Sequence, residues 1–179
     1  MNTNQNPAPN IPKDFLEKHP HLKDFMGFLY ELNSESPRGS VLASCGYLEE
    51  LLKEILLAFM LKNKVAEELV GDGLVPLGSF SARTQAAYVL GLISENEFKE
   101  LNNLRKIRNL FAHKVKMSFE VQKVKDLCSN LIFSAKDYGE VRMSAHGQFS
   151  TAATSLILNL VNRPHYVGQK AVRYEEWPY

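Results

Sequence analysis

The chain has 179 residues, of which 45% are hydrophobic and 23% are charged. Its 21 Lys and Arg residues nearly balance its 20 Asp and Glu residues, so the formal net charge is +1. This composition excludes collagen-like, mucin-like and wholly disordered chains, and it provides enough apolar residues for one domain or two small ones. A near-neutral chain can bind a polyanion only through a local patch.

The N-terminus, the cysteines and the longest apolar stretch bear on where the protein works. Residues 1–12 lack the basic start and apolar run of a secretory signal, and they predict a disordered leader. Cys45 and Cys128 fall within apolar helical patterns, which predicts two reduced core thiols. Charged residues interrupt the stretch 41–62, so it is no membrane span. We expect a cytoplasmic protein that does not contact a membrane.

The first half of the chain predicts two helices and a long loop. A helix is expected from about residue 21 to residue 32, followed by a connection in which Ser40 serves as the N-cap of the next helix. From Val41 to Phe59 apolar residues recur every three or four positions, which is typical of a core helix. The glycines and proline of residues 71–78 form the strongest loop signal in the sequence.

The second half of the chain continues the helical pattern. Ser79 or Ser81 should cap a helix after the loop, and the capping box of Ser94 and Glu97 predicts another helix that starts near Glu95 and ends at His113 or Val115. The remaining expected segments are a helix over 119–133, a mixed loop over 139–147, and a short apolar element over 152–161 that is either helix or strand.

Successive amphipathic helices with short loops, and no alternating strand pattern, predict an all-α antiparallel helical bundle. We expect this bundle to be one domain over residues 13–163, followed by an irregular C-terminal tail over 164–179.

Metal and cofactor motifs do not occur in the sequence. Neither Cys-x-x-Cys nor His-x-x-x-His is present, so we expect no metal site. The loop at 71–78 lacks the Gly-Lys-Ser/Thr ending of a P-loop, and there is no Gly-x-Ser-x-Gly elbow. We therefore expect no cofactor. The five histidines are His19, His21, His113, His146 and His165.

One segment, residues 101–114, places polar side chains within an apolar stripe. On a helical wheel Arg108 shares a side with Leu104 and Phe111, a core position where an unpaired arginine is rare. Arg105, Asn109 and His113 follow at i, i+4 and i+8 along an adjoining face.

Two interpretations of this segment stay open. In the first, the guanidinium groups, the amide and the imidazole form an edge that faces another molecule. In the second, Arg108 pairs with a buried acid across the bundle, such as Glu49, Glu50 or Glu54, and His113 lies near a helix C-terminus where its charged form is favoured.

Charge is unevenly distributed along the chain. Residues 99–125 contain eight basic residues against two acidic ones, whereas residues 49–72 contain six acids against three bases. Such separation can serve docking between subunits as well as binding of nucleic acid, although a solvated helix face is the default for any single lysine. The basic residues are Lys99, Arg105, Lys106, Arg108, Lys114, Lys116, Lys123 and Lys125.

The stretch Asp72-Gly73-Leu74-Val75-Pro76-Leu77-Gly78-Ser79-Phe80-Ser81-Ala82-Arg83 resembles the signature of the bacterial mannitol operon repressor (MtlR) family. The resemblance continues through Tyr88-Val89-Leu90-Gly91-Leu92-Ile93 into the 97–113 helix and covers residues 25–135. It implies an all-helical transcriptional regulator that lacks a recognisable DNA-reading module and acts mainly through protein contacts. Arg83 would match the family arginine, either as a binding residue or by bonding loop carbonyls around Pro76 to Gly78.

The shorter stretch Arg108-Asn109-Leu110-Phe111-Ala112-His113 is similar to the Arg-polar-x-x-x-His motif of HEPN domains, helical bundles that often dimerise and in many cases cut RNA without a metal. In that interpretation Arg108 holds the scissile phosphate, His113 transfers a proton and Asn109 orients one of them. A dimer would be needed to pair two motifs.

Two functions are therefore expected from the sequence. The first is a homodimeric regulator with protein partners and with nucleic acid as a further partner of the 99–125 segment. Its candidate binding residues are Arg83, Arg105, Lys106, Lys114 and Lys116. The alternative is a HEPN-like metal-independent ribonuclease, or toxin-type RNA-binding module, with Arg108, Asn109 and His113 as catalytic residues.

Overall fold

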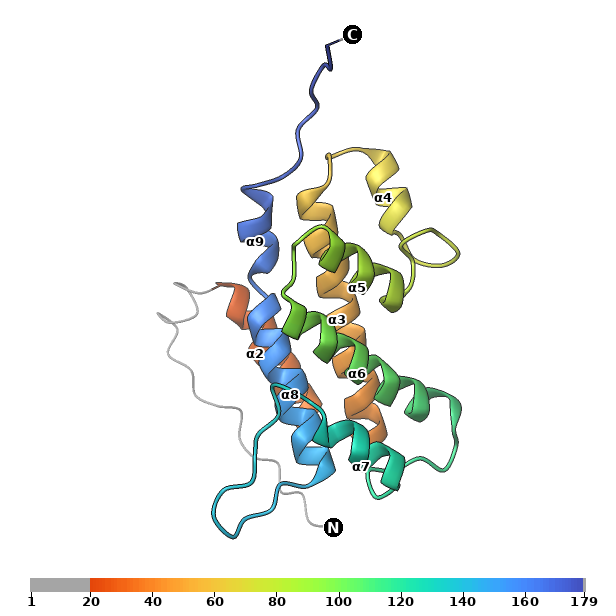
Figure 1. The fold of residues 1–179 in the computed structure, drawn as a ribbon, viewed down its shortest axis with the longest axis vertical. Coiled ribbons are helices and arrows are strands. Elements are labelled where there is room, and N and C mark those ends of the chain that lie inside the picture. The colour runs from red at the N-terminus through yellow and green to blue at the C-terminus, as the bar shows by residue number, and fades with distance from the viewer. Residues whose placement is uncertain (1–19, 179) are drawn as a thin grey trace.

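The computed structural model describes residues 20–178, and the side chains from Phe25 onward, so the predicted leader over 1–12 lies outside it. This part of the chain is helical without a strand, with only an isolated bridge between Tyr138 and Val141 (Figure 1). The all-α prediction is confirmed. The elements are α2 Pro20–Ser34, α3 Pro37–Phe59, α4 Lys64–Val70, α5 Phe80–Val89, α6 Glu95–His113, α7 Gln122–Ser129, α8 Ala145–Leu160 and α9 Arg163–Gly168.

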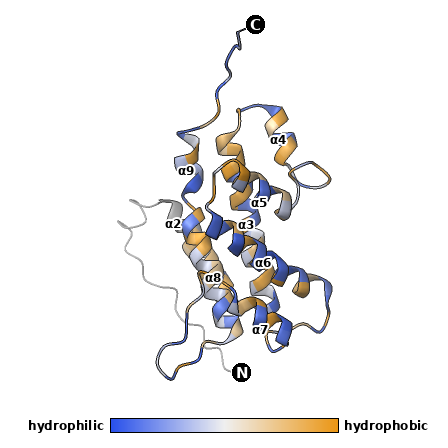
Figure 2. Cartoon of the chain, viewed as in Figure 1, coloured by the Kyte–Doolittle hydropathy of each residue, from blue (hydrophilic) through white to orange (hydrophobic). Residues whose placement is uncertain are grey.

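The long helix α3 forms the centre of the bundle. It packs against α2, α4, α5, α6, α8 and α9 (Figure 1). Its apolar stripe is enclosed, and each of its buried Leu and Ile side chains contributes roughly 1.5–3 kcal/mol of transfer free energy. The fully buried residues of this stripe include Val41, Leu48, Leu52, Ile55 and Leu56. Figure 2 shows hydrophobic colours along much of α3, whereas α6 shows long hydrophilic stretches.

The start of α3 corrects one prediction. Ser36, and not Ser40, is the N-cap, and its Oγ accepts a hydrogen bond from the backbone N–H of Gly39 at 3.0 Å. Pro37 occupies the first helical turn, where its fixed φ and missing N–H are tolerated. Ser40 lies one turn further along, buried in the helix, and its Oγ donates to the carbonyl of Pro37.

The other helix starts follow the sequence more closely. Ser79 caps α5, and Ser94 and Glu97 form the predicted capping box at the start of α6. The apolar element at 152–161 is the second half of the helix α8. A short helix, α9, occupies the beginning of the tail that was expected to be irregular, and its start fits Pro164 in the first turn.

The helix expected over 119–133 is too long, because α7 covers only Gln122–Ser129. The chain leaves the helix there because Glu100 of α6 binds the backbone of the following segment. Its carboxylate, fully buried, accepts hydrogen bonds from the N–H groups of Ile132 at 2.7 Å and Phe133 at 3.0 Å. Burial raises the pKa of Glu100, and the two N–H groups oppose that rise.

Replacing Glu100 with Ala should lower the free energy of unfolding by about 3 kcal/mol, because two buried N–H groups would lose their acceptor. Urea denaturation followed by circular dichroism measures the change. Glu120→Ala, which removes an exposed carboxylate paired with Lys125, is the matched control and should cost less than about 1 kcal/mol. Equal losses for the two variants would contradict the anchoring role of Glu100.

Candidate functional site

Helix α6 carries most of the residues that the sequence identified. It is continuous from Glu95 to His113, so its side chains follow regular helical spacing. Leu101, Leu104 and Phe111 are fully buried against the core. Arg108 lies at the edge of this stripe and is half-buried.

Arg108 does not form the internal ion pair that one interpretation of the sequence required. Its Nη1 donates a hydrogen bond to Oδ1 of the adjacent Asn109 at 3.3 Å, and no salt bridge joins it to a carboxylate among the side chains described from Phe25 onward. Glu49 instead approaches Arg83, with Oε1 3.9 Å from Nη1, and Glu50 pairs with Lys53.

Arg105 is similarly placed one turn earlier. Its Nη2 donates to Oδ1 of Asn102 at 3.3 Å, whereas its Nε is buried and has no hydrogen-bond partner in the described chain. Among the partners that the described residues provide, these two neighbouring guanidinium groups of α6 therefore have only amide oxygens.

His113 is the last residue of α6 and is exposed. It lies five positions after Arg108, and this spacing corresponds to a rotation of about 140° around a helix. Asn109, four residues before His113, lies on the same face as the histidine. Arg108 and His113 of one helix therefore point in different directions. A site that uses both side chains would need residues from a second copy of the chain.

The C-terminal end of α6 is held by a residue that the sequence analysis missed. The guanidinium of Arg38, in the first turn of α3, donates to the carbonyls of Ala112 at 3.2 Å and of Lys114 and Val115 at 3.3 Å. The carbonyl of Ala112 belongs to the last turn of α6, where no partner within the helix is available, and those of Lys114 and Val115 follow directly after the helix. No local pattern indicates this contact, because the partners are more than 70 residues apart.

The predicted lysines of the basic segment remain on the surface. Lys106, Lys114 and Lys116 are exposed, and Lys106 donates to Oδ1 of Asn103 at 3.4 Å. Two other lysines of the segment are paired, Lys99 with Glu95 at 2.6 Å and Lys125 with Glu120 at 2.7 Å. The positive field of the segment is therefore smaller than its sequence suggests.

Arg83 holds the glycine-rich loop from inside. It is only 2% exposed, and it donates to the carbonyls of Leu77, Val70 and Gly71 at 2.9–3.1 Å. Its Nη2 also lies 3.0 Å from Oδ1 of Asp72, and this contact holds the pKa of Asp72 below its usual range. The geometry favours the loop-bonding role over the binding role that was considered for Arg83.

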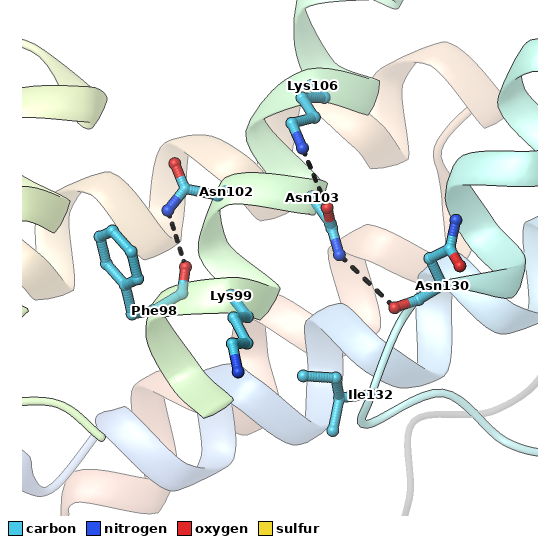
Figure 3. A pocket seen from close by; sticks show the side chains of 7 residues that line it. All are labelled: Phe98, Lys99, Asn102, Asn103, Lys106, Asn130 and Ile132. Carbon is cyan, nitrogen blue, oxygen red and sulfur yellow. Dashed lines mark hydrogen bonds between the residues drawn. The ribbon is translucent and has the colours of Figure 1, made fainter. Parts of the chain in front are cut away.

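A shallow pocket of about 350 Å³ lies over the outer side of α6 (Figure 3). The pocket has an amide-rich lining, and Asn103 donates across it to the carbonyl of Asn130 at 3.4 Å. Asn102 forms part of its wall and also accepts the bond from Arg105. The lining consists of Phe98, Lys99, Asn102, Asn103, Lys106, Asn130 and Ile132.

The remaining candidate groups are the metal-ligating side chains and the two thiols. Among the side chains described from Phe25 onward, no cluster of three or more His, Cys, Asp or Glu is arranged to hold a metal ion. Cys45 and Cys128 are both free and lie in the core as predicted, and burial raises the pKa of each thiol to about 12. None of the helices in the same range has the length and apolar character to cross a membrane.

The fold matches a known structure. No protein-family model matches this chain, and neither does any curated protein. A chain in the X-ray structure of the MtlR–HPr complex from Escherichia coli superposes with a TM-score of 0.61 at 20% sequence identity. The match covers 75% of this chain and 96% of the other. The protein has an MtlR-like fold.

Replacing Arg83 with Ala should lower the free energy of unfolding by about 3–5 kcal/mol, because several loop carbonyls and Asp72 would lose a buried partner. Arg83→Lys should recover only a minor part of the loss, since one ammonium group cannot reach all the acceptors. Thermal and urea unfolding measure both effects. Arg173→Ala, in the exposed C-terminal segment, is the control and should stay within about 0.5 kcal/mol of the parent. A mild effect of Arg83→Ala would contradict the structural role.

Proposed function

We propose that the protein is a transcriptional regulator that works through contacts with other proteins, in the manner implied by its resemblance to the mannitol operon repressor family. The observation that carries this proposal is the match of three quarters of the chain to nearly the whole of a chain crystallised in the MtlR–HPr complex. That structure is a complex of two proteins. Binding of a protein partner is therefore the function that the shared fold supports best for this chain.

The surface of this chain supports the same proposal. At the end of α5, Tyr88, Val89 and Leu90 are exposed next to one another, and the ring of Tyr88 stacks on Phe98 at 4.3 Å. In the C-terminal segment, Tyr174 and Trp177 are each 80% exposed. Exposed aromatic groups of this kind are common anchors of protein interfaces.

The C-terminal segment is attached to the bundle close to the end of α3. The N–H of Val172 donates to the carbonyl of Phe59 at 2.8 Å, and beyond this point the chain extends away from the helices (Figure 1). Tyr174 and Trp177 are thus presented outside the bundle, in a position suited to a partner.

A direct test uses the HPr protein of the same host and the full-length chain in isothermal titration calorimetry. We expect a complex in the micromolar range or tighter, and no binding by the chain alone to DNA of the operon whose transcription it changes. Deleting the gene should change transcript levels, and the Tyr174→Ala/Trp177→Ala variant should restore them less well than the parent. Transcript levels that do not respond to the deletion, together with no HPr complex at about 100 µM, would contradict the proposal.

The HEPN-like ribonuclease remains a second candidate because Arg108 has no acidic partner in the described chain and His113 is exposed. Both groups are therefore free to meet a substrate, and a homodimer could bring two copies of the motif together.

Bulk RNA incubated in EDTA with the parent and with Arg108→Ala/His113→Ala distinguishes the two candidates. The regulator predicts that neither protein cleaves RNA, since Arg108 and His113 diverge on the helix. Cleavage by the parent that disappears in the variant would establish the ribonuclease. Light scattering on the same samples measures whether the protein is a dimer.

A further inference from the structure

An apolar surface extends from the end of α5 to the pocket over α6. Val89 and Leu90 are exposed, and the neighbouring Tyr88 stacks its ring on that of Phe98, with the ring centroids 4.3 Å apart. Phe98 also lines the pocket of about 350 Å³, and Ile132 supplies another apolar part of the lining (Figure 3). Single exposed apolar residues are ordinary, whereas a patch that continues over several elements is typical of a protein contact site.

The rim of this pocket is positively charged. Lys99 and Lys106 both line it, and Lys106 bonds to the amide oxygen of Asn103 at 3.4 Å. The ion pair between Lys99 and Glu95 is exposed on both sides, so it contributes little stability and Lys99 can pair with another carboxylate instead. The pocket is therefore suited to an occupant that combines a large apolar side chain with acidic neighbours.

The C-terminal segment of the chain has this combination. Its sequence Tyr174-Glu175-Glu176-Trp177 places two acids between two aromatic residues, and all four side chains are exposed. None of the four forms an ion pair or a ring contact with the described side chains of its own copy.

This segment extends away from its own bundle. The N–H of Val172 donates to the carbonyl of Phe59 at the end of α3, and the chain beyond this bond runs away from α6 (Figure 1). Five extended residues, the separation of Val172 and Trp177, span at most about 18 Å. In this conformation the two aromatic side chains are presented to a second molecule.

A tryptophan side chain matches the lining of the pocket. Indole has apolar faces and a single N–H donor, so it favours apolar walls that stand beside a hydrogen-bond acceptor. Phe98 and Ile132 provide the apolar contact, and the amides of Asn102, Asn103 and Asn130 provide acceptors. Tryptophan is also among the residues that most often contribute a large share of the binding energy of an interface.

We propose that two copies of this chain associate by exchanging their C-terminal segments. Trp177 of one copy occupies the α6 pocket of the other, and Glu175 and Glu176 lie near Lys99 and Lys106. Exchange in both directions gives a closed dimer with two equivalent contacts. The proposal concerns a contact between copies of this chain, so it does not rest on the binding of a different protein, and each contact is measured separately.

The fluorescence of the full-length protein tests the proposal directly, because Trp177 is the one tryptophan of the sequence. We expect its emission to move to shorter wavelength as the protein concentration rises to about 100 µM, a range in which small interfaces form. Sedimentation velocity should show a dimer over the same range. A monomer with unchanged emission at about 100 µM would overturn the proposal.

The aromatic anchor is tested by substitution. Trp177→Ala should raise the dimer Kd at least about tenfold, because it removes the side chain that fills the pocket. Tyr138→Ala is the matched control, since Tyr138 is 87% exposed and lies outside the pocket and the C-terminal segment. The control should change the Kd less than about twofold. Equal dimerisation of parent and Trp177→Ala would overturn the proposal.

The charges are tested by reversal and rescue. Lys99→Glu/Lys106→Glu should raise the dimer Kd at least about tenfold, because it places acids of both copies opposite one another. Adding Glu175→Lys/Glu176→Lys to the same chain should restore the dimer, a result that a folding defect would not give.

Lys114→Glu/Lys116→Glu reverses two exposed charges outside the pocket and is the control for the charge reversal. An equal loss of affinity in this control, or no rescue by the fourfold variant, would overturn the proposal.

Carbodiimide crosslinking of a mixture of isotope-labelled and unlabelled protein locates the contact. It should join Lys99 or Lys106 of one copy to Glu175 or Glu176 of the other. Crosslinks within one copy only, or from these lysines to acids elsewhere in the chain such as those of residues 14–24, would overturn the proposal.

Discussion

Two buried carboxylates of α6 fix that helix within the bundle. Glu97 closes the capping box, accepting the N–H of Ser94 at 2.7 Å, and also pairs with Arg163, which binds the start of α9 to the α5–α6 connection. Glu100 takes two N–H groups from the chain after α7. A charged group in a low-dielectric interior is tolerated only when hydrogen bonds or an opposite charge compensate for its lost hydration. Glu95, the third acid of α6, pairs with Lys99. The carboxylates of α6 therefore all have partners other than Arg105 and Arg108.

The two buried carboxylates in the N-terminal half of α6 therefore have hydrogen-bond partners. The two arginines that follow them have no acidic partner among the described side chains. Within the described residues, Arg105 and Arg108 bond to the amide oxygens of Asn102 and Asn109.

The sequence predicted what local chemistry determines. The bounds of α6 follow from its capping box and from the end of its apolar stripe, and the core positions of α3 follow from its periodicity. Contacts between distant segments had no such signal. Arg38 meets α6 across more than 70 residues, and Glu100 shortens the helix expected after residue 119 through backbone groups 32 and 33 residues away. Ser40 was mistaken for the cap because Pro37 allows the helix to start one turn earlier.

The guanidinium group of Arg108, unlike that of Arg163, has no counter-charge among the side chains described from Phe25 onward. Urea unfolding of Arg108→Gln and Arg163→Gln at neutral pH, without added ligand, measures this difference most directly. The account predicts that Arg108→Gln changes the free energy of unfolding by less than about 1 kcal/mol, whereas Arg163→Gln, which leaves buried Glu97 unpaired, lowers it by about 3 kcal/mol or more. A loss of about 3–5 kcal/mol for Arg108→Gln would show that Arg108 is internally paired and would contradict the account.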